Sequence, residues 1–475
     1  MKRFFALTVL ALLIVVSCSN ERGVEPLENQ GSSSLNLDPE YLAAEIIAET
    51  GWLDADGELR TPEGCGNIIG MEREEVAPGI AHYSYTLKIG EGDYDVIGLH
   101  RVVKEGRPYK PIKTCQNVFI QHGDGVGFEG VFLYGTVSPS IPGDHAFAIY
   151  LAQNDIDVWG IDQNWILVPQ GTTDFSFMAD WGMQNQIENL DVAISIARFT
   201  RLMTGGGPGK MLLLGYSSGA ATGYSYLNWE TQRDEKCRNV RGYIPVDMAF
   251  KTDDPGLLGT GCYFAGAKQV AYEGGQYGDP VYFAPLGYLA MTDPDGGSPI
   301  VPGFTNYQVA MVYGAATFML SPLTPTYHFL AGTYDEYGMP DGFQFNTDQG
   351  WFEFMVTGCA YEATLFEVDY LNTIGDCVDV PFDDHLGDVC IPILNVGSAG
   401  GMGNYSEYTL SLLGSTDVTS FVVSLYPPEY VVADFGHIDL FTANNAEGLV
   451  WMPVLDWIVD HSCRYGKADQ SWTKE

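Results

Sequence analysis

The sequence predicts an α/β fold in which helices cover both faces of a mostly parallel sheet. Short apolar runs of strand length recur along the chain, and helical segments separate them. The runs lie at residues 117–120, 156–161, 211–214, 242–246, 391–396 and 420–425. Strands that are apolar throughout and alternate with helices are typical of a buried parallel sheet.

Composition and charge indicate a globular protein and exclude some classes of partner. The chain has 475 residues, of which 46% are hydrophobic and 18% charged, as expected of a globular protein. Its 61 acidic residues exceed its 23 Lys and Arg, giving a net charge of −38. This balance argues against nucleic-acid partners and anionic membrane surfaces, which require basic patches.

The first residues predict export. Lys2 and Arg3 precede an apolar stretch at residues 4–16, which spans about 20 Å as a helix and is too short to cross a bilayer. We therefore interpret residues 1–17 as a signal peptide. The sequence around Cys18 resembles a bacterial lipobox, which implies a lipidated Cys18 and an outer-membrane or cell-surface lipoprotein. Membrane association would then be through this lipid only. Ordinary secretory cleavage near Ser17 is the alternative.

The chain divides into a tether, a core and an insertion. Residues 18–37 are polar and predict a tether. The core is expected at 38–247 and 385–475, and it starts with a helix opened by Asp38 and Pro39. Residues 248–384 are rich in Gly, Pro, Asp and aromatic residues with little clean periodicity. We expect this segment to form a cap over the mouth of the sheet.

Further elements follow in chain order. Alternating residues between 83 and 100 predict two antiparallel strands. A helix is expected at 186–203, with apolar residues on one face and Gly205 as its stop. The glycine-rich residues 205–210 precede a strand instead of following one, so they predict a helix–strand connection and not a phosphate loop. The last helix runs through Val450 to Ile458.

The cysteines predict disulfide staples. Eight remain after Cys18, and an even number in an exported chain is typical of disulfides. They are Cys65, Cys115, Cys237, Cys262, Cys359, Cys377, Cys390 and Cys463. Their spacing does not suggest zinc, and the acidic pairs lack the full spacing of a calcium loop, so we expect no metal.

Residues 214–220 carry the strongest chemical signal. They read Leu-Gly-Tyr-Ser-Ser-Gly-Ala and contain a G-x-S-x-G motif. A chain of this length and composition would contain about 0.3 such motifs by chance, so the motif alone is a weak signal. An apolar strand runs into the motif and a helix of small residues leaves it. This context is typical of a nucleophile elbow, so Ser217 is the predicted nucleophile.

The serine needs a base and an oxyanion hole. His328, His385, His437 and His461 follow it in the chain. His437 lies between the last predicted strand and the last helix, where a catalytic base after an elbow is expected. The oxyanion donors should be the backbone amides of Ser218 and Asp124, the latter in the loop after the strand at 117–120, with Gly123 next in preference.

Together these segments resemble the acid lipase branch of the α/β-hydrolases, the gastric and lysosomal type. The matching segments are the strands within 83–102, residues 121–123, 151–159, the helix before the elbow, 215–219 and 436–441. The resemblance implies hydrolysis of carboxylic esters, often of lipids, without metal or organic cofactor. It also implies a cap between strands six and seven, where 248–384 falls.

The sequence departs from the family at the acid of the triad. The family places this acid in the turn after strand seven, where residues 397–403 contain no acid. Asp247, at the end of strand six, is the preferred candidate, and Glu407, Asp417 and Asp434 stay open. The predicted function is a serine hydrolase of small-molecule or lipid esters. A serine peptidase or amidase, and a non-catalytic surface binding lipoprotein on the same scaffold, are the alternatives.

Overall fold

The computed structural model describes residues 67–207, 209–320 and 324–462. The predicted signal peptide, Cys18, the tether and the helix opened by Asp38 lie outside these residues. Within the described ranges, the helices are all too short or too polar to cross a membrane.

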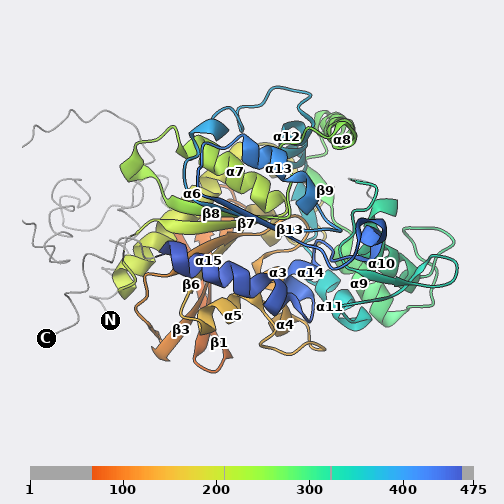
Figure 1. Ribbon diagram of the computed structural model, residues 1–475, viewed down its shortest axis with the longest axis horizontal. Helices are drawn as coiled ribbons and strands as arrows, with labels where there is room; N and C mark the ends of the chain where they lie inside the picture. Colours follow the sequence, from red (N-terminus) through yellow and green to blue (C-terminus); the bar gives the residue numbers. More distant parts are fainter. Residues whose placement is uncertain (1–66, 208, 321–323, 463–475) are drawn as a thin grey trace, which may run out of the picture.

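One large sheet forms the centre of the molecule (Figure 1). Its strands, in spatial order, are β1 (Asn67–Ala77), β2 (Ile80–Lys88), β3 (Val96–Arg107), β6 (Asp157–Asp162), β5 (Asn117–Gln121), β7 (Met211–Tyr216), β8 (Val240–Val246), β13 (Ile393–Ser398) and β14 (Val418–Val423), with β4 (Lys110–Pro111) beside β3. From β6 to β14 all neighbours are parallel. The mostly parallel sheet and its six apolar strands are therefore confirmed.

The antiparallel end of the sheet contains a strand that the sequence pattern does not predict. The pair β2–β3 is confirmed, but β1 pairs with β2 as a further strand. Its residues 71–77 read Met-Glu-Arg-Glu-Glu-Val-Ala, with the charge content of a helix surface. Charged side chains suit an edge strand because they discourage pairing with another chain.

Helices cover both faces of the sheet, as predicted (Figure 1). The helices of the core are α3 (Phe128–Phe132), α4 (Tyr134–Val137), α5 (Phe147–Gln153), α6 (Met183–Thr204), α7 (Ser218–Glu230), α13 (Glu407–Ser411), α14 (Asp439–Thr442) and α15 (Met452–Ser462). Alternate residues of β7 enter different cores: Leu212 packs with the face covered by α5 and α15, and Leu213 packs with α6 and α7. Gly205 ends α6 with φ 87°, as the stop signal predicts.

The segment between β8 and β13 lies beside the carboxyl ends of the parallel strands. It contains α8 (Pro255–Glu273), β9 (Gly278–Pro280), α9 (Phe283–Thr292), α10 (Asn306–Ala315), β10 (Gly332–Tyr334), β11 (Pro340–Phe343), α11 (Asp348–Val356), β12 (Tyr361–Ala363) and α12 (Thr364–Gly375). Figure 1 shows these elements grouped to one side of the sheet. Its role as a cap stays a prediction.

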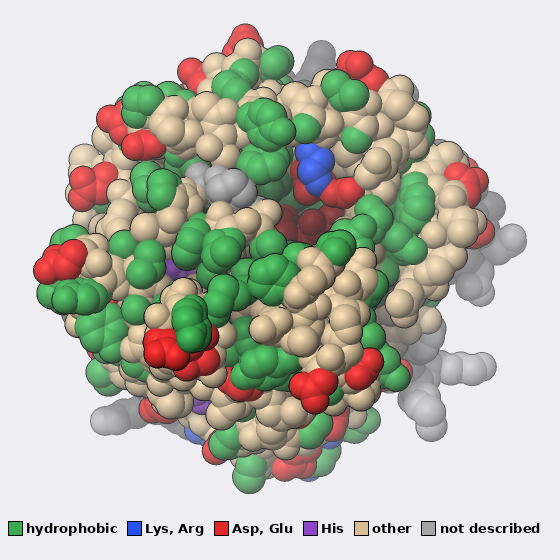
Figure 2. All heavy atoms as spheres, turned by 90° about the vertical axis from the view of Figure 1, so that its right-hand side faces the viewer, with side chains coloured by type: hydrophobic (Ala, Val, Ile, Leu, Met, Phe, Trp, Pro, Cys, Tyr) green, Lys and Arg blue, Asp and Glu red, His purple; other side chains and the backbone are tan. Residues whose placement is uncertain are grey.

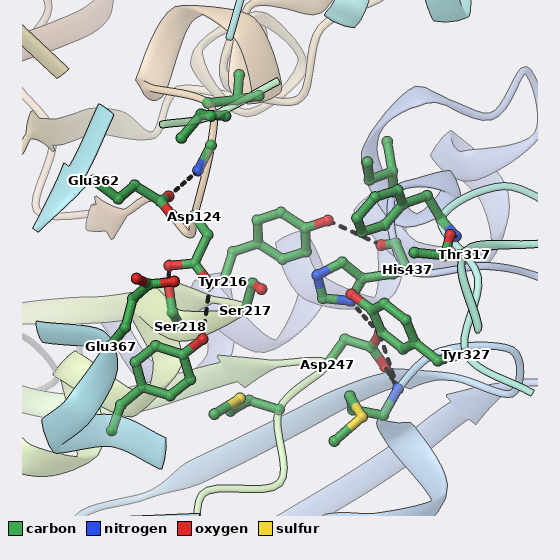
Figure 3. A pocket seen from close by; sticks show the side chains of 18 of the residues that line it. Asp124, Tyr216, Ser217, Ser218, Asp247, Thr317, Tyr327, Glu362, Glu367 and His437 are labelled. Atoms are coloured by element: carbon green, nitrogen blue, oxygen red, sulfur yellow. Dashed lines mark hydrogen bonds and ion pairs between the residues drawn. The ribbon is translucent and has the colours of Figure 1, made fainter. Parts of the chain in front are cut away.

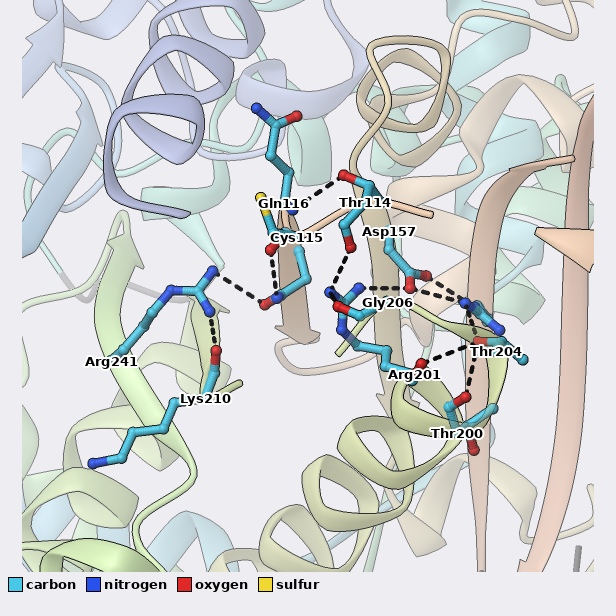
Figure 4. A network of polar contacts seen from close by, with 12 residues as sticks. Thr114, Cys115, Gln116, Asp157, Thr200, Arg201, Thr204, Gly206, Lys210 and Arg241 are labelled. Carbon is cyan, nitrogen blue, oxygen red and sulfur yellow. Dashed lines mark hydrogen bonds and ion pairs between the residues drawn. The ribbon is translucent and has the colours of Figure 1, made fainter. Parts of the chain in front are cut away.

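A buried ion cluster joins the start of β6 to the end of α6 (Figure 4). The Asp157 carboxylate accepts two hydrogen bonds from Arg101, at 2.9 and 2.8 Å, and one from Arg201 at 2.6 Å. Arg201 also donates to the backbone oxygen of Gly206 at 3.0 Å. The glycine-rich residues after α6 thus take part in packing the sheet, in agreement with a helix–strand connection.

The cysteine prediction is confirmed in part. Cys262 on α8 forms a disulfide with Cys377, which lies two residues after the end of α12. Cys115 is also disulfide-bonded. Cys359 and Cys390 carry free thiols, so the expectation that all eight are staples is wrong for these two. Burial raises the pKa of the Cys359 thiol, which keeps it protonated.

Candidate active site

Ser217 sits on a strained turn between β7 and α7. Its backbone has φ 57° and ψ −132°, a conformation that residues with a side chain rarely adopt. The glycines of the motif are required by close packing. A Cβ at Gly215 would lie 2.5 Å from the backbone oxygen of Gly219, and one at Gly219 would lie 2.1 Å from that of His122. The structure therefore places Ser217 on an elbow at the carboxyl end of a central strand.

His437 and Asp247 form a direct pair beside this elbow (Figure 3). The ring Nδ1 of His437 lies 2.6 Å from Oδ2 of Asp247. Both side chains are buried, with exposed fractions of 4% and 0%. A carboxylate at Nδ1 fixes the tautomer in which Nε2 is free to accept a proton.

The turn after β13 supports the Asp247 carboxylate instead of supplying an acid. Asp247 Oδ1 accepts from the Ser398 amide at 2.8 Å, and Oδ2 accepts from the Ser398 hydroxyl at 3.0 Å. The Met402 amide donates to both oxygens at 3.2 Å. A Cβ at Gly401 would lie 2.0 Å from Asp247 Oδ2, so the glycine leaves room for this carboxylate.

The other candidate acids contact different groups. Glu407 is exposed at the start of α13. Asp417 lies 3.6 Å from His461, and Asp434 accepts from the amides of Leu425 and its neighbours in the loop after β14. Asp439, close to His437 in sequence, accepts from the amides of Ala331 and Gly436 at 2.7 Å each. Asp247 is thus the candidate acid that the structure brings to His437.

Aromatic rings hold the imidazole in place. The ring of Tyr216 stacks on His437 at 4.7 Å between centroids, and the Tyr216 hydroxyl donates to the His437 backbone oxygen at 3.1 Å. Tyr327 and Phe329 lie at 5.4 and 6.2 Å. In the part of the chain that the structure describes, Ser217 Oγ forms no hydrogen bond with His437; such bonds often tighten only when substrate binds.

The loop after β5 lies against the serine. A Cβ at Gly123 would lie 2.6 Å from the Cβ of Ser217. His122 fixes this loop: its Nε2 accepts from the Gln163 amide at 3.0 Å, so Nδ1 carries the proton that binds the Gly123 oxygen at 2.7 Å. Burial lowers the pKa of His122 and keeps it neutral. The Ser218 amide, first in α7, has no acceptor within its helix.

The Asp124 side chain has contacts that the sequence pattern does not predict. Its Oδ1 accepts from the Ser218 hydroxyl at 2.5 Å, and its Oδ2 accepts from the Tyr370 hydroxyl at 3.4 Å (Figure 3). Burial raises the pKa of this carboxyl. The predicted oxyanion residues, Ser218 and Asp124, are therefore joined to each other through their side chains as well as adjoining Ser217.

A pocket of about 360 Å³ contains these residues. Ser217, Asp247 and His437 line it together with side chains from α8, α9, α10, α11 and α12. Figure 2 shows the molecular surface hollowed here, with acidic side chains deep in the hollow and a basic one near its edge. The sequence pattern missed Tyr327, Glu362 and Glu367, because they lie more than 100 residues from the elbow and carry no motif of their own.

A group of potential metal ligands lies apart from this pocket. His82, His100 and Glu129 offer ligand atoms within 4.8 Å of one another. The two rings hydrogen-bond to each other at 3.0 Å, and His100 Nε2 lies 3.0 Å from Asp162. Burial lowers the pKa of His82 to about 3. The close approach of the two imidazole rings is explained by these hydrogen bonds and does not require a metal ion.

Comparison with known proteins identifies the fold. The chain matches no protein-family model and no curated protein. Among solved structures it is similar to a "putative lipase" from Sulfolobus solfataricus, with 19% identity, a TM-score of 0.55 and coverage of 82% of this chain and 99% of that one. Two further matches have lower TM-scores. They are an esterase from Exiguobacterium antarcticum (11% identity, 77% and 96% coverage, TM-score 0.39) and a haloalkane dehalogenase variant from Bradyrhizobium elkanii (14%, 84% and 100%, 0.37). The chain has the α/β-hydrolase fold.

Proposed function

We propose that this α/β-hydrolase fold carries a serine hydrolase that cleaves carboxylic esters, of the lipase and esterase kind, through an acyl-enzyme on Ser217. The observation that carries the proposal is the meeting of three groups in one pocket: a serine on a strained elbow, a buried imidazole and a carboxylate on its Nδ1. An imidazole oriented in this way can activate a serine hydroxyl, which by itself is a weak nucleophile.

The reaction proceeds in two halves. Ser217 Oγ attacks the ester carbonyl carbon while His437 Nε2 takes the hydroxyl proton, and Asp247 stabilises the imidazolium. The amides of Ser218 and Asp124 donate to the oxyanion, and each such donor contributes about 10²–10³ in rate. His437 then gives the proton to the leaving alcohol. Water, deprotonated by His437, attacks the acyl-enzyme and releases the acid and free Ser217.

A fluorophosphonate probe tests this proposal. The probe phosphonylates an activated serine, so we expect the wild-type protein to be labelled and Ser217→Ala to be unlabelled on a gel or by intact mass. Ser411→Ala, which changes an exposed serine on α13, is the matched control and should label as the wild type does. A folded wild-type protein that never labels would contradict the proposal and favour a binding protein on this scaffold.

The substrate class and location extend the proposal. The resemblance to acid lipases supports an ester with an apolar acyl chain, and the pocket walls include Phe264, Phe283, Phe329 and Phe354. Nitrophenyl esters of increasing chain length, compared with aminoacyl amides, separate an esterase from a peptidase or amidase. The Cys262–Cys377 disulfide supports an exported protein. Metabolic labelling with palmitate that is lost in Cys18→Ala would support the predicted lipoprotein.

A further inference from the structure

Several carboxylates lie deep in the pocket beside the proposed nucleophile. Asp124 belongs to the loop after β5, Glu362 to β12 and Glu367 to α12, and all three line the pocket with Ser217. The exposed fractions are 7% for Glu362 and 9% for Glu367, and Asp124 is half-buried. Figure 3 shows Asp124, Glu362 and Glu367 on one side of Ser217, with His437 and Asp247 on the other. We call these three side chains the acidic wall.

Lys268, the lysine among the described residues that line the pocket, already binds two carboxylates and does not neutralise Asp124 or Glu362. Lys268 Nζ lies 2.8 and 2.7 Å from the two oxygens of Glu367 and also contacts Asp279. Its positive charge is therefore shared between two carboxylates. Asp124 has hydroxyl donors only, from Ser218 and Tyr370. Glu362 accepts at Oε1 from the Gly125 amide.

Two polar groups of the pocket have no hydrogen-bond partner. Among the described residues, nothing donates to Glu362 Oε2, and the hydroxyl of Tyr327 makes no hydrogen bond. Both side chains are at least nine-tenths buried, with exposed fractions of 7% and 5%, and both line the pocket. Because both residues line the pocket, a ligand that supplies hydrogen-bond donors and positive charge can reach these groups and complete their hydrogen bonds.

Burial favours the protonated form of the carboxyls in the acidic wall. Burial raises the pKa of Asp124, of Glu362 and of Glu367, the last to about 8, and the neighbouring carboxylates add to the rise for Glu362. The other titratable groups around the wall are Lys268 on α8, Asp279 on β9, Tyr313 on α10, Tyr327, Cys359, Tyr370 on α12, His437 and Asp247. A cation that enters should displace a proton, so its binding should strengthen as pH rises.

We propose that the acidic wall binds a protonated amine on the substrate, placed next to the ester that Ser217 attacks. The inference rests on the proposed function and narrows its substrate class. Because Asp124 bonds the residue after the nucleophile, the amine must lie within a few bonds of the scissile carbonyl, on the acyl or the alcohol portion. An N–H-bearing ammonium balances the charge that Glu362 takes on when it gives up its proton, and it donates a hydrogen bond to the second oxygen of that carboxylate.

A metal ion fits this wall less well. A metal site needs at least three ligand atoms close together. Among the described residues, His82, His100 and Glu129 are the group whose ligand atoms lie within 4.8 Å of one another, so the carboxylates of the wall do not converge on one ion. The wall already binds the ammonium of Lys268. The lysine side chain is itself an organic ammonium, so a substrate ammonium matches the chemistry that the wall already binds.

Isosteric ester pairs test the proposal, one pair for each portion of the substrate. On the acyl side, the p-nitrophenyl ester of β-alanine is compared with p-nitrophenyl butanoate; on the alcohol side, dimethylaminoethyl butanoate is compared with isopentyl butanoate. The measured quantity is kcat/KM for the ammonium ester divided by kcat/KM for its neutral partner. This ratio is then divided by the ratio of the rates at which hydroxide alone hydrolyses the two esters, which removes their difference in intrinsic reactivity. We expect at least a ~10-fold preference for the ammonium ester in one arm, the scale of a hydrogen bond to a charged group.

Variants locate the preference. Glu362→Gln keeps an oxygen for the Gly125 amide but removes the charge, so the ratio should fall about tenfold. Asp295→Asn removes an exposed charge outside the pocket and should leave the ratio unchanged. The wild-type preference should also increase as pH rises toward the pKa of Glu367, about 8, while the amine stays protonated. A ratio that falls equally in both variants would overturn the inference.

The inference and the proposed function fail in different ways. Hydrolysis of neutral esters with no ammonium preference in either arm would overturn the inference and leave the hydrolase intact. If no ester is hydrolysed and no probe labels Ser217, the hydrolase fails, and calorimetry then decides the inference separately. Ser217→Ala protein should bind β-alaninamide more tightly than its isostere butanamide, and equal binding of the two would overturn the ammonium site.

Discussion

At the residue scale, the Asp247 carboxylate takes its hydrogen bonds from a turn that has no acid of its own. Asp247 adopts φ 52° at the end of β8, which turns its side chain toward Ser398 and His437. Gly401 leaves the space that the carboxylate occupies. The acid and the turn are complementary, so a carboxylate in the turn would compete with Asp247 for the same position beside His437.

This complementarity predicts a large effect of Asp247→Asn. The amide carries no negative charge to stabilise the imidazolium, and its NH₂ group can donate to Nδ1 and favour the tautomer in which Nε2 holds the proton, so kcat on an activated ester should fall about 10⁴-fold. Glu407→Gln, which changes an exposed residue on α13, should keep wild-type kcat. Equal turnover by the two variants would show that Asp247 is not the acid of this site.

The sequence predicts the parts of the site that are local in the chain. Ser217 is marked by the strand, turn and helix around it, and His437 by its place between a strand and a helix. The acid stayed open among four residues because its identity depends on how β8 aligns with the turn after β13, 151 residues away between Asp247 and Ser398. No local pattern contains that alignment. The partners of Asp124 in the acidic wall are hidden for the same reason.

At the element scale, two packed helices hold the ion pair at the helical end of the acidic wall. Lys268 lies on α8 and Glu367 on α12, and these helices approach closely where a Cβ at Gly261 would lie 2.9 Å from the backbone nitrogen of Gly375. The Cys262–Cys377 disulfide joins them at the same end. The helix α12 buries residues on several sides, whereas α8 buries one row at Leu257, Gly261 and Ala265 and leaves Tyr263 and Val270 exposed. In both helices apolar residues lie around the whole circumference, so a search for one apolar face misses them.

Removing this disulfide should therefore weaken both the fold and the pocket. It closes a loop of 115 residues, and the chain-entropy model gives up to about 5 kcal/mol for a loop of that length. Cys262→Ser with Cys377→Ser should lower the free energy of unfolding in urea and reduce kcat/KM. Cys390→Ser, which changes an exposed free thiol, is the control and should stay near wild type in both measurements. A double variant as stable as the control would contradict a structural role.

At the scale of the whole molecule, buried titratable groups link stability to pH. Burial raises the pKa of Glu230 to about 7 and that of Glu367 to about 8, so the folded state binds protons that the unfolded state has released at that pH. Stability should rise as pH falls through these values. Burial lowers the pKa of His82 to about 3, so below the ordinary His value near 6.5 the unfolded state binds an extra proton, and the contribution of His82 alone lowers stability.

The two opposing trends predict a stability maximum on the acid side of neutrality. Lower pH also reduces the self-repulsion of a chain with net charge −38, which favours the compact state. The urea midpoint should therefore increase from about pH 8 to about pH 5, where two raised carboxyls outweigh one lowered imidazole, and decrease below the ordinary Glu pKa of about 4.3, where only the His82 contribution is left. Glu230→Gln, which can still accept from Tyr226 and the Asn239 amide, should flatten the alkaline limb, whereas the exposed Glu235→Gln should not. A midpoint that rises steadily from acid to alkaline pH would contradict this balance, because it would require depressed carboxyl pKa values to outweigh the raised ones.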